Sequence, residues 1–119
     1  MTSLQNTQVE ITHHQKTTHG ALLTFMVEPS LDYFKGHFPT APILAGVVQL
    51  DWAVNFGQQY LSLKPHAVKQ VEVLKYQLVI TPNTQVFLEL EQKSEVKFTF
   101  KFYSEHGTHS SGRIVLEEN

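Results

Sequence analysis

The hydrophobic period of this chain changes at Gly46, and that change limits the possible folds more than any other feature of the sequence. From Gly46 to about Leu61 there is no proline, and apolar residues occur round most of a helical circumference. These residues are Val47, Val48, Leu50, Trp52, Ala53, Val54 and Phe56. A helix that is apolar over most of its surface needs cover from other structure, so the sequence predicts one enclosed helix.

The remainder of the chain has the pattern of strands. Alternation is clearest at residues 95–103, where one face would carry Val96, Phe98, Phe100 and Phe102. The six predicted strands are residues 8–15, 20–28, 68–80, 84–92, 95–103 and 109–117. Together with the helix, the order ββαββββ favours α+β architecture, with one curled antiparallel sheet of about six strands wrapped round a long central helix. The free edges of such a sheet favour dimerisation.

Length and charge narrow the class of protein further. The chain has 119 residues, the length of one domain, and we expect residues 1–119 to form a single domain. A net charge of -2 gives no electrostatic support for nucleic-acid binding, and the absence of cysteine excludes disulfides and thiolate metal sites. The polar N-terminus lacks a signal peptide, and no stretch reaches the roughly 20 apolar residues that span a bilayer. We therefore expect a cytoplasmic protein without membrane insertion.

The longest segment without a hydrophobic period runs from Leu31 to Gly46, and the candidate chemistry begins there. His37 lies in a proline-bounded loop and can act as a base or an acid near neutrality. Gly46 opens the predicted helix, where unpaired backbone N–H groups can stabilise negative charge on an oxygen. Asp51 follows about 7.5 Å along the helix, where apolar surroundings favour the protonated form of a carboxyl group. A base, an oxyanion site and an acid are the functions that β-elimination from a 3-hydroxyacyl thioester requires.

The residues alone leave simpler interpretations open. A lone histidine beside a turn is more often structural, and Gly46 could provide only a flexible entry to the helix. Asp51 shares a helical stripe with Asn55 and Gln58, which is typical of a solvated polar face. Without further context, these residues indicate a globular domain with a candidate site.

The segment GHFPTAPILAGVVQLD resembles the signature of the 3-hydroxyacyl-acyl-carrier-protein dehydratases of bacterial fatty-acid synthesis. The matching positions are His37, Phe38, Pro39, Pro42, Gly46 and Asp51. Aspartate in the last position is similar to the 3-hydroxydecanoyl branch, and the string PILAGVVQLDWA resembles the small dehydratases of aryl-polyene pigment clusters. The chain departs from the family pattern at Ala45, where the family has proline, and at Asn83 and Thr84, where it has Gly-Asp.

The resemblance implies a hotdog fold and a reaction. The reaction is dehydration of 3-hydroxyacyl carrier-protein thioesters to trans-2-enoyl thioesters, in aryl-polyene or fatty-acid-like chain elongation. His37 would take the C2 proton, while the N–H of Gly46, helped by that of Val47, would polarise the thioester carbonyl. Asp51, supplied by the other subunit, would act on the departing hydroxyl. The resemblance implies no metal and no organic cofactor.

The resemblance also implies two partners, a second dehydratase chain and an acyl carrier protein. The active site would be shared across a homodimer, with a heterodimer of related dehydratases as the alternative. Acyl carrier proteins are acidic, so a local basic patch should receive them. The candidate basic residues are Lys64, Lys69, Lys75, Lys97, Lys101 and Arg113.

Two other functions are considered, a hotdog acyl thioesterase and a non-catalytic subunit that binds acyl chains. The GHFP histidine argues against the first, and the presence of both His37 and Asp51 argues against the second. The apolar helix and the phenylalanine row predict a narrow apolar tunnel for an extended chain. Solvated positions, rather than a metal site, are predicted for His13, His14, His19, His66, His106 and His109.

Overall fold

The computed structural model describes residues 8–31, 43–64 and 67–118. Within these ranges it contains one helix and six strands, in the predicted order ββαββββ. In chain order they are β1 (Ile11–Lys16), β2 (Gly20–Val27), α1 (Gly46–Tyr60), β3 (Val68–Tyr76), β4 (Thr84–Ser94), β5 (Lys97–Ser104) and β6 (Gly107–Leu116). The largest difference from the sequence prediction is in the third strand, which ends at Tyr76 instead of extending to residue 80.

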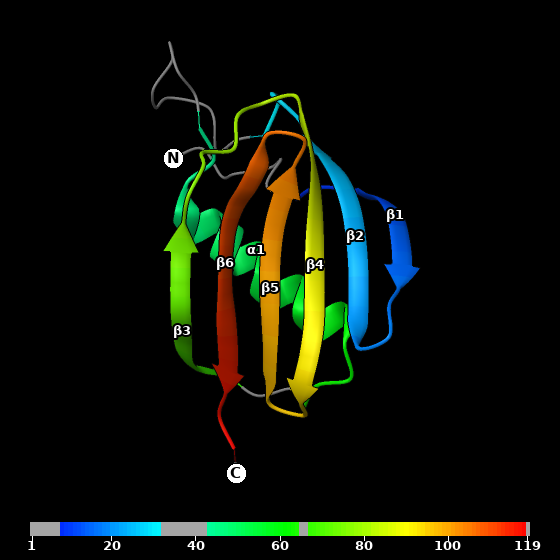
Figure 1. Ribbon diagram of the computed structural model, residues 1–119, viewed down its shortest axis with the longest axis vertical. Helices are drawn as coiled ribbons and strands as arrows, with labels where there is room; N and C mark the ends of the chain where they lie inside the picture. The colour runs from blue at the N-terminus through cyan, green and yellow to red at the C-terminus, as the bar shows by residue number, and fades with distance from the viewer. Residues whose placement is uncertain (1–7, 32–42, 65–66, 119) are drawn as a thin grey trace, which may run out of the picture.

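The strands form one antiparallel sheet with the order β1-β2-β4-β5-β6-β3. Figure 1 shows that the sheet is curled and that β1 and β3 are its two outer strands. The sheet does not close on itself, so among the described residues each outer strand has one edge without a neighbouring strand. The predicted hotdog arrangement, a curled antiparallel sheet round one helix, is confirmed.

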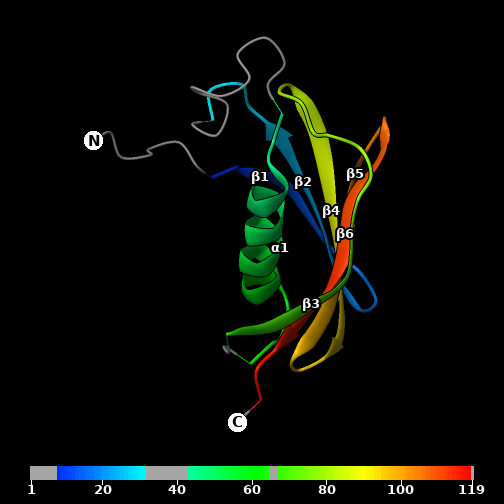
Figure 2. The same cartoon turned by 90° about the vertical axis from the view of Figure 1, so that its left-hand side faces the viewer.

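The helix α1 lies along one face of the sheet (Figure 2). Its buried residues are Val48, Gln49, Trp52, Ala53, Phe56 and Gly57. On its other side Val47 is 72% exposed, and Asp51 and Asn55 are also exposed. One sheet buries only one stripe of a helix. Among the described residues, the apolar surface predicted for the helix is therefore buried only on the side that faces the sheet. The helix is neither long enough nor apolar enough to cross a membrane, and the described residues include no other helix.

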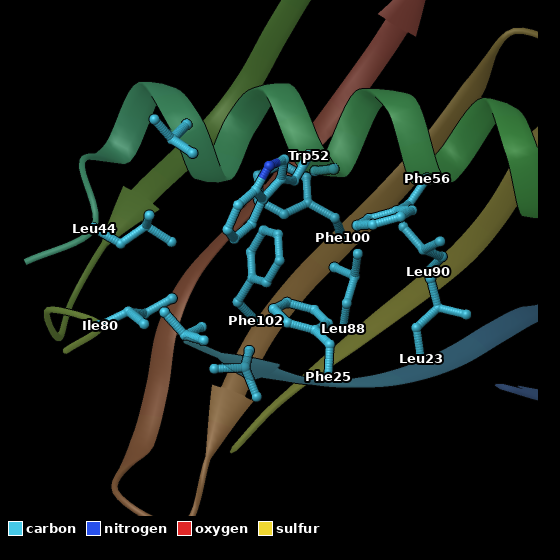
Figure 3. Close-up of a cluster of buried hydrophobic side chains, with 14 of the residues drawn as sticks. Leu23, Phe25, Leu44, Trp52, Phe56, Ile80, Leu88, Leu90, Phe100 and Phe102 are labelled. Atoms are coloured by element: carbon cyan, nitrogen blue, oxygen red, sulfur yellow. The ribbon is translucent and has the colours of Figure 1, made fainter. Parts of the chain in front are cut away.

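The predicted phenylalanine row belongs to the core between α1 and the sheet. Phe98, Phe100 and Phe102 of β5 are between 0% and 2% exposed. Figure 3 shows Trp52 directed from α1 towards the strands, and its indole meets Phe25 of β2 edge-on with ring centroids 5.8 Å apart. These aromatic side chains fill the space between helix and sheet, and they hold α1 in a fixed position above the strands.

Candidate active site

The sequence predicts a site formed by His37, Gly46, Val47 and Asp51. His37 lies outside the described residues, so its role stays a prediction. The other three belong to α1, with Gly46 and Val47 as its first two residues and Asp51 in its second turn. The start of this helix is therefore the part of the predicted site that can be described.

The first turn of α1 has backbone N–H groups that the described residues leave unpaired. Ala45 precedes the helix in an extended conformation and provides no side-chain cap. Its carbonyl accepts hydrogen bonds from the Val48 and Gln49 N–H groups, with N···O distances of 3.1 and 3.3 Å. Within the described ranges, the N–H groups of Gly46 and Val47 have no acceptor, and the first turn has no acidic side chain. This positive end of the helix can therefore bind an oxygen that gains negative charge.

Tyr76, at the end of β3, packs directly against Gly46. The Tyr76 hydroxyl donates a hydrogen bond to the Gly46 carbonyl with an O···O distance of 2.8 Å. A Cβ atom at position 46 would lie 2.6 Å from Cζ of the Tyr76 ring, so only glycine allows this approach. Partial burial raises the pKa of the Tyr76 hydroxyl above its ordinary value of 10.0, so the hydroxyl is a protonated donor at neutral pH and well above it. Glycine at position 46 is thus explained by its contact with Tyr76, beyond any flexibility at the helix entry.

Asp51 lies on the exposed side of α1. Its Oδ2 atom accepts a hydrogen bond from Nδ2 of Asn55 at 3.3 Å, and Gln58 follows on the same exposed stripe. Among the described residues, this carboxyl group therefore lacks the apolar surroundings that the sequence predicts for it. An acid role for Asp51 requires cover beyond what these residues provide.

A cavity of ≈ 330 Å³ adjoins the start of α1. Its lining is mainly apolar and consists of Ile43, Leu44, Ala45, Gly46, Gln49, Tyr76, Gln77, Leu78 and Val79. The predicted phenylalanine row does not contribute to this lining, because those rings are buried in the core. The residues after β3 take their place, and sequence reasoning missed them because it assigned residues 77–80 to a strand.

Buried polar side chains fix the walls of this cavity. Gln49 is 3% exposed, and its Oε1 accepts a hydrogen bond from the Ser110 hydroxyl at 2.7 Å. Its Nε2 donates to the Leu44 carbonyl at 3.2 Å. Both ends of the amide are therefore used within the protein, so Gln49 holds the segment before α1 in place instead of offering a free group to a ligand.

His109 corrects the prediction that the remaining histidines are solvated. It is 1% exposed, with Nε2 2.6 Å from the Ser104 hydroxyl oxygen and Nδ1 3.1 Å from the Leu78 carbonyl. Because a carbonyl can only accept, Nδ1 carries the proton in this arrangement. The bond holds the segment after β3 against β6, and Leu78 of that segment lines the cavity, so the role of His109 is structural.

The other described histidines are exposed, and they are His13, His14, His19 and His106. His66 lies outside the described residues. Across the part of the chain that the structure describes, no three His, Asp or Glu side chains converge into a group that could hold a metal ion.

The predicted basic residues differ in whether they already pair with a carboxylate, and Lys75 and Lys101 both lie opposite Ser111 of β6. Three of them pair with carboxylates at distances of 3.1 to 3.9 Å, and these pairs are Lys64 with Glu95, Lys101 with Glu89 and Arg113 with Glu72. Lys69 and Lys75 are exposed on β3, the strand that ends beside the cavity. Lys97 is half-buried on β5. Lys75 directly precedes Tyr76, which lines the cavity.

Comparison with known proteins identifies the family. The family model described as ApeI-like, ApeI dehydratase, matches residues 12–113. A search of curated proteins finds no significant match. Among solved structures, the dehydratase heterocomplex ApeI:P from Xenorhabdus doucetiae has a TM-score of 0.82 and 28% sequence identity, over 93% of this chain and 99% of the matched chain. An uncharacterized protein from Erwinia carotovora subsp. atroseptica has a TM-score of 0.69 and 29% identity, over 92% of this chain and 94% of its own. The predicted resemblance to the aryl-polyene dehydratases is confirmed, and the chain belongs to the ApeI-like family of dehydratases.

Proposed function

We propose that this protein converts 3-hydroxyacyl thioesters on an acyl carrier protein into trans-2-enoyl thioesters during aryl-polyene chain elongation. Membership of a dehydratase family supports loss of water as the reaction. The observation that carries the proposal is the start of α1, where the N–H groups of Gly46 and Val47 have no acceptor among the described residues and Gly46 lines a mainly apolar cavity. A thioester oxygen bound there would gain negative charge at the positive end of a helix.

The proposed reaction needs one proton removed and one proton supplied. His37 takes the C2 proton, and the electron pair from that C–H bond shifts towards the thioester oxygen, which the Gly46 and Val47 N–H groups stabilise. The C2–C3 double bond then forms as the C3–O bond breaks. Asp51 donates a proton to the departing hydroxyl, which leaves as water. Return of the proton from His37 to Asp51 through solvent restores both groups, so one water is released for each enoyl thioester formed.

We propose that a second dehydratase chain completes the site. Apolar side chains are exposed at the start of α1 and along β3 and the segment after it, at Val47, Val68, Val73, Leu74, Tyr76, Leu78 and Val79. β3 is also an outer strand of the sheet, with one edge available for pairing. A chain docked here would cover Val47 and supply surroundings that exclude water from the site. The solved relative from Xenorhabdus doucetiae is described as a heterocomplex, which supports a heterodimer with a related dehydratase beside the homodimer.

The test of the reaction uses His37→Ala and Asp51→Asn with a 3-hydroxyacyl carrier-protein substrate. Both variants should fold and lose most of the turnover, because each removes a group used in the same transition state. His13→Ala is the matched control, since His13 is an exposed histidine on β1. If the wild-type protein forms free thiol instead of the enoyl product, it is a thioesterase. If it forms neither product, even after a related dehydratase chain is added, it is a binding subunit. Near-normal dehydration by His37→Ala would overturn the proposed mechanism.

Mixing the two inactive variants tests whether the site is shared. In a mixed homodimer, one site combines both substitutions and the other has neither, so random exchange should restore about one quarter of wild-type turnover. A site contained within one chain predicts no restoration from the same mixture. If the purified chain gains activity only when a related dehydratase chain is added, the working assembly is the heterodimer.

Carrier-protein docking is proposed at Lys69 and Lys75. Both are exposed on β3, and within the described ranges neither has a carboxylate within ion-pair distance. Replacing either with glutamate should raise KM for the carrier-bound substrate in low salt but not for the same acyl chain on pantetheine. Lys64→Glu is the matched control, because Lys64 pairs with Glu95 at 3.1 Å. Equal effects on both substrates would exclude docking as the role of these lysines.

A further inference from the structure

The outer strand β3 contains a β-bulge close to the start of α1. Between the paired positions Glu72 and Lys75, two residues of β3, Val73 and Leu74, lie opposite only Gly112 of β6. Val73 has a φ of 46°, a left-handed conformation that is strained for a β-branched residue. A bulge of this kind bends the strand and changes the direction of the side chains that follow it.

The bulge decides which side chain of β3 faces the helix. Successive side chains of a strand point to opposite faces, and one inserted residue reverses the order after it. Before the bulge, Val71 pairs with the buried Ile114, and after it, Tyr76 pairs with the buried Ser110. Both therefore point to the inner face, towards α1. In a regular strand of this sequence, Lys75 would take the inner position and Tyr76 would face outward.

Tyr76 uses the inner position to hold the first peptide unit of the helix. Its hydroxyl donates to the Gly46 carbonyl at 2.8 Å. The Gly46 carbonyl and the Val47 N–H belong to one planar peptide unit, so a hydrogen bond that fixes the carbonyl also fixes the direction of the N–H. A hydrogen bond accepted by the carbonyl also polarises the unit, which makes the N–H a stronger donor.

We propose that Tyr76 is a positioning residue of the oxyanion site, which orients and polarises the Val47 N–H towards the thioester oxygen. The proposal rests on the proposed dehydratase function and adds a residue to it. Negative charge on the thioester oxygen develops mainly in the transition state, so a fixed and polarised donor lowers the barrier more than it tightens substrate binding. The bulge at Val73 has a role in this arrangement, because it places Tyr76 against the helix.

Tyr76→Phe tests the proposal, since it keeps the ring against Gly46 and removes only the hydroxyl. We expect kcat to fall about tenfold with KM changed less than about twofold, because the lost interaction acts on the transition state. In the NMR spectrum, the amide proton of Val47 should move upfield as its peptide unit loses polarisation. Tyr103→Phe is the matched control, because Tyr103 is half-buried on β5, where it stacks on Phe87 with ring centroids 5.3 Å apart. It should change neither kcat nor the Val47 amide.

The two measurements separate this inference from the proposed function. If the wild-type protein dehydrates and Tyr76→Phe matches its kcat, Tyr76 has no positioning role. A purely structural role would lower the melting temperature while leaving the kcat of the folded variant and the Val47 amide unchanged, and this result would also overturn the proposal. If the wild-type protein dehydrates no substrate, the proposed function fails. The positioning effect is then tested by NMR alone, and an unchanged chemical shift of the Val47 amide proton in Tyr76→Phe would refute it.

Discussion

Gly57→Ala should destabilise this protein, although alanine is the better helix former. Gly57 lies inside α1, where it faces β5, and a Cβ atom there would come within 2.4 Å of Cζ of Phe98. Phe98 is 0% exposed, so its ring has no open space to move into. Alanine would gain about 1 kcal/mol of helix propensity, while forcing a methyl group into a packed core costs about 1–3 kcal/mol. We expect the difference to appear as a loss of about 1 kcal/mol in the free energy of unfolding.

Urea denaturation at one fixed protein concentration measures this loss, because the stability of the proposed dimer would depend on concentration. Gln59 provides the control, since it is exposed on the same helix. The free energy of unfolding of Gln59→Ala should exceed that of Gln59→Gly by about 1 kcal/mol. Phe98→Leu removes the ring atoms that clash, so the double variant should show a favourable coupling of about 1 kcal/mol with Gly57→Ala. A Gly57→Ala protein more stable than wild type would refute the close approach of α1 to β5.

Two further predictions concern the bulge and the substrate. Val73→Gly should be about 1 kcal/mol more stable than Val73→Ala. A left-handed φ of 46° strains alanine, and this strain exceeds the larger conformational entropy that glycine loses on folding. Urea denaturation of Val73→Gly and Val73→Ala measures the difference, and the usual strand order with alanine ahead would argue against the bulge. Polyenyl or aryl-polyenyl 3-hydroxyacyl carrier proteins should have higher kcat/KM than saturated substrates of equal length, mainly through KM, because a stiff chain loses less entropy on binding. Equal or better turnover of saturated substrates would refute the aryl-polyene pathway and leave the dehydratase assignment intact.

Most of the fold could be predicted because its elements follow simple periods. In β5 phenylalanines alternate with more polar neighbours, and Phe98, Phe100 and Phe102 are between 0% and 2% exposed. The helix was predicted at almost its observed length, since Gly46 opens it and the segment contains no proline. The prediction failed after Tyr76, where residues 77–80 continue the pattern of a strand, but residues 77–79 form a wall of the cavity. Their backbone instead bonds to His109 and Leu44, in contacts between distant parts of the sequence that no local period reveals.

The candidate site was harder to predict, because its residues act through partners that periodicity does not show. Regular alternation would place Tyr76 on the outer face, and only a bulge at a residue that disfavours left-handed conformations brings it to Gly46. Gly46 is explained by that contact, since a Cβ atom would lie 2.6 Å from the ring. Asp51 poses the opposite problem, because its apolar neighbours on the helix suggest burial, while it is exposed among the described residues. An acid role for Asp51 needs surroundings that exclude water, and the proposed second subunit would supply them, so the carboxyl group that would catalyse the reaction also supports the proposed shared site.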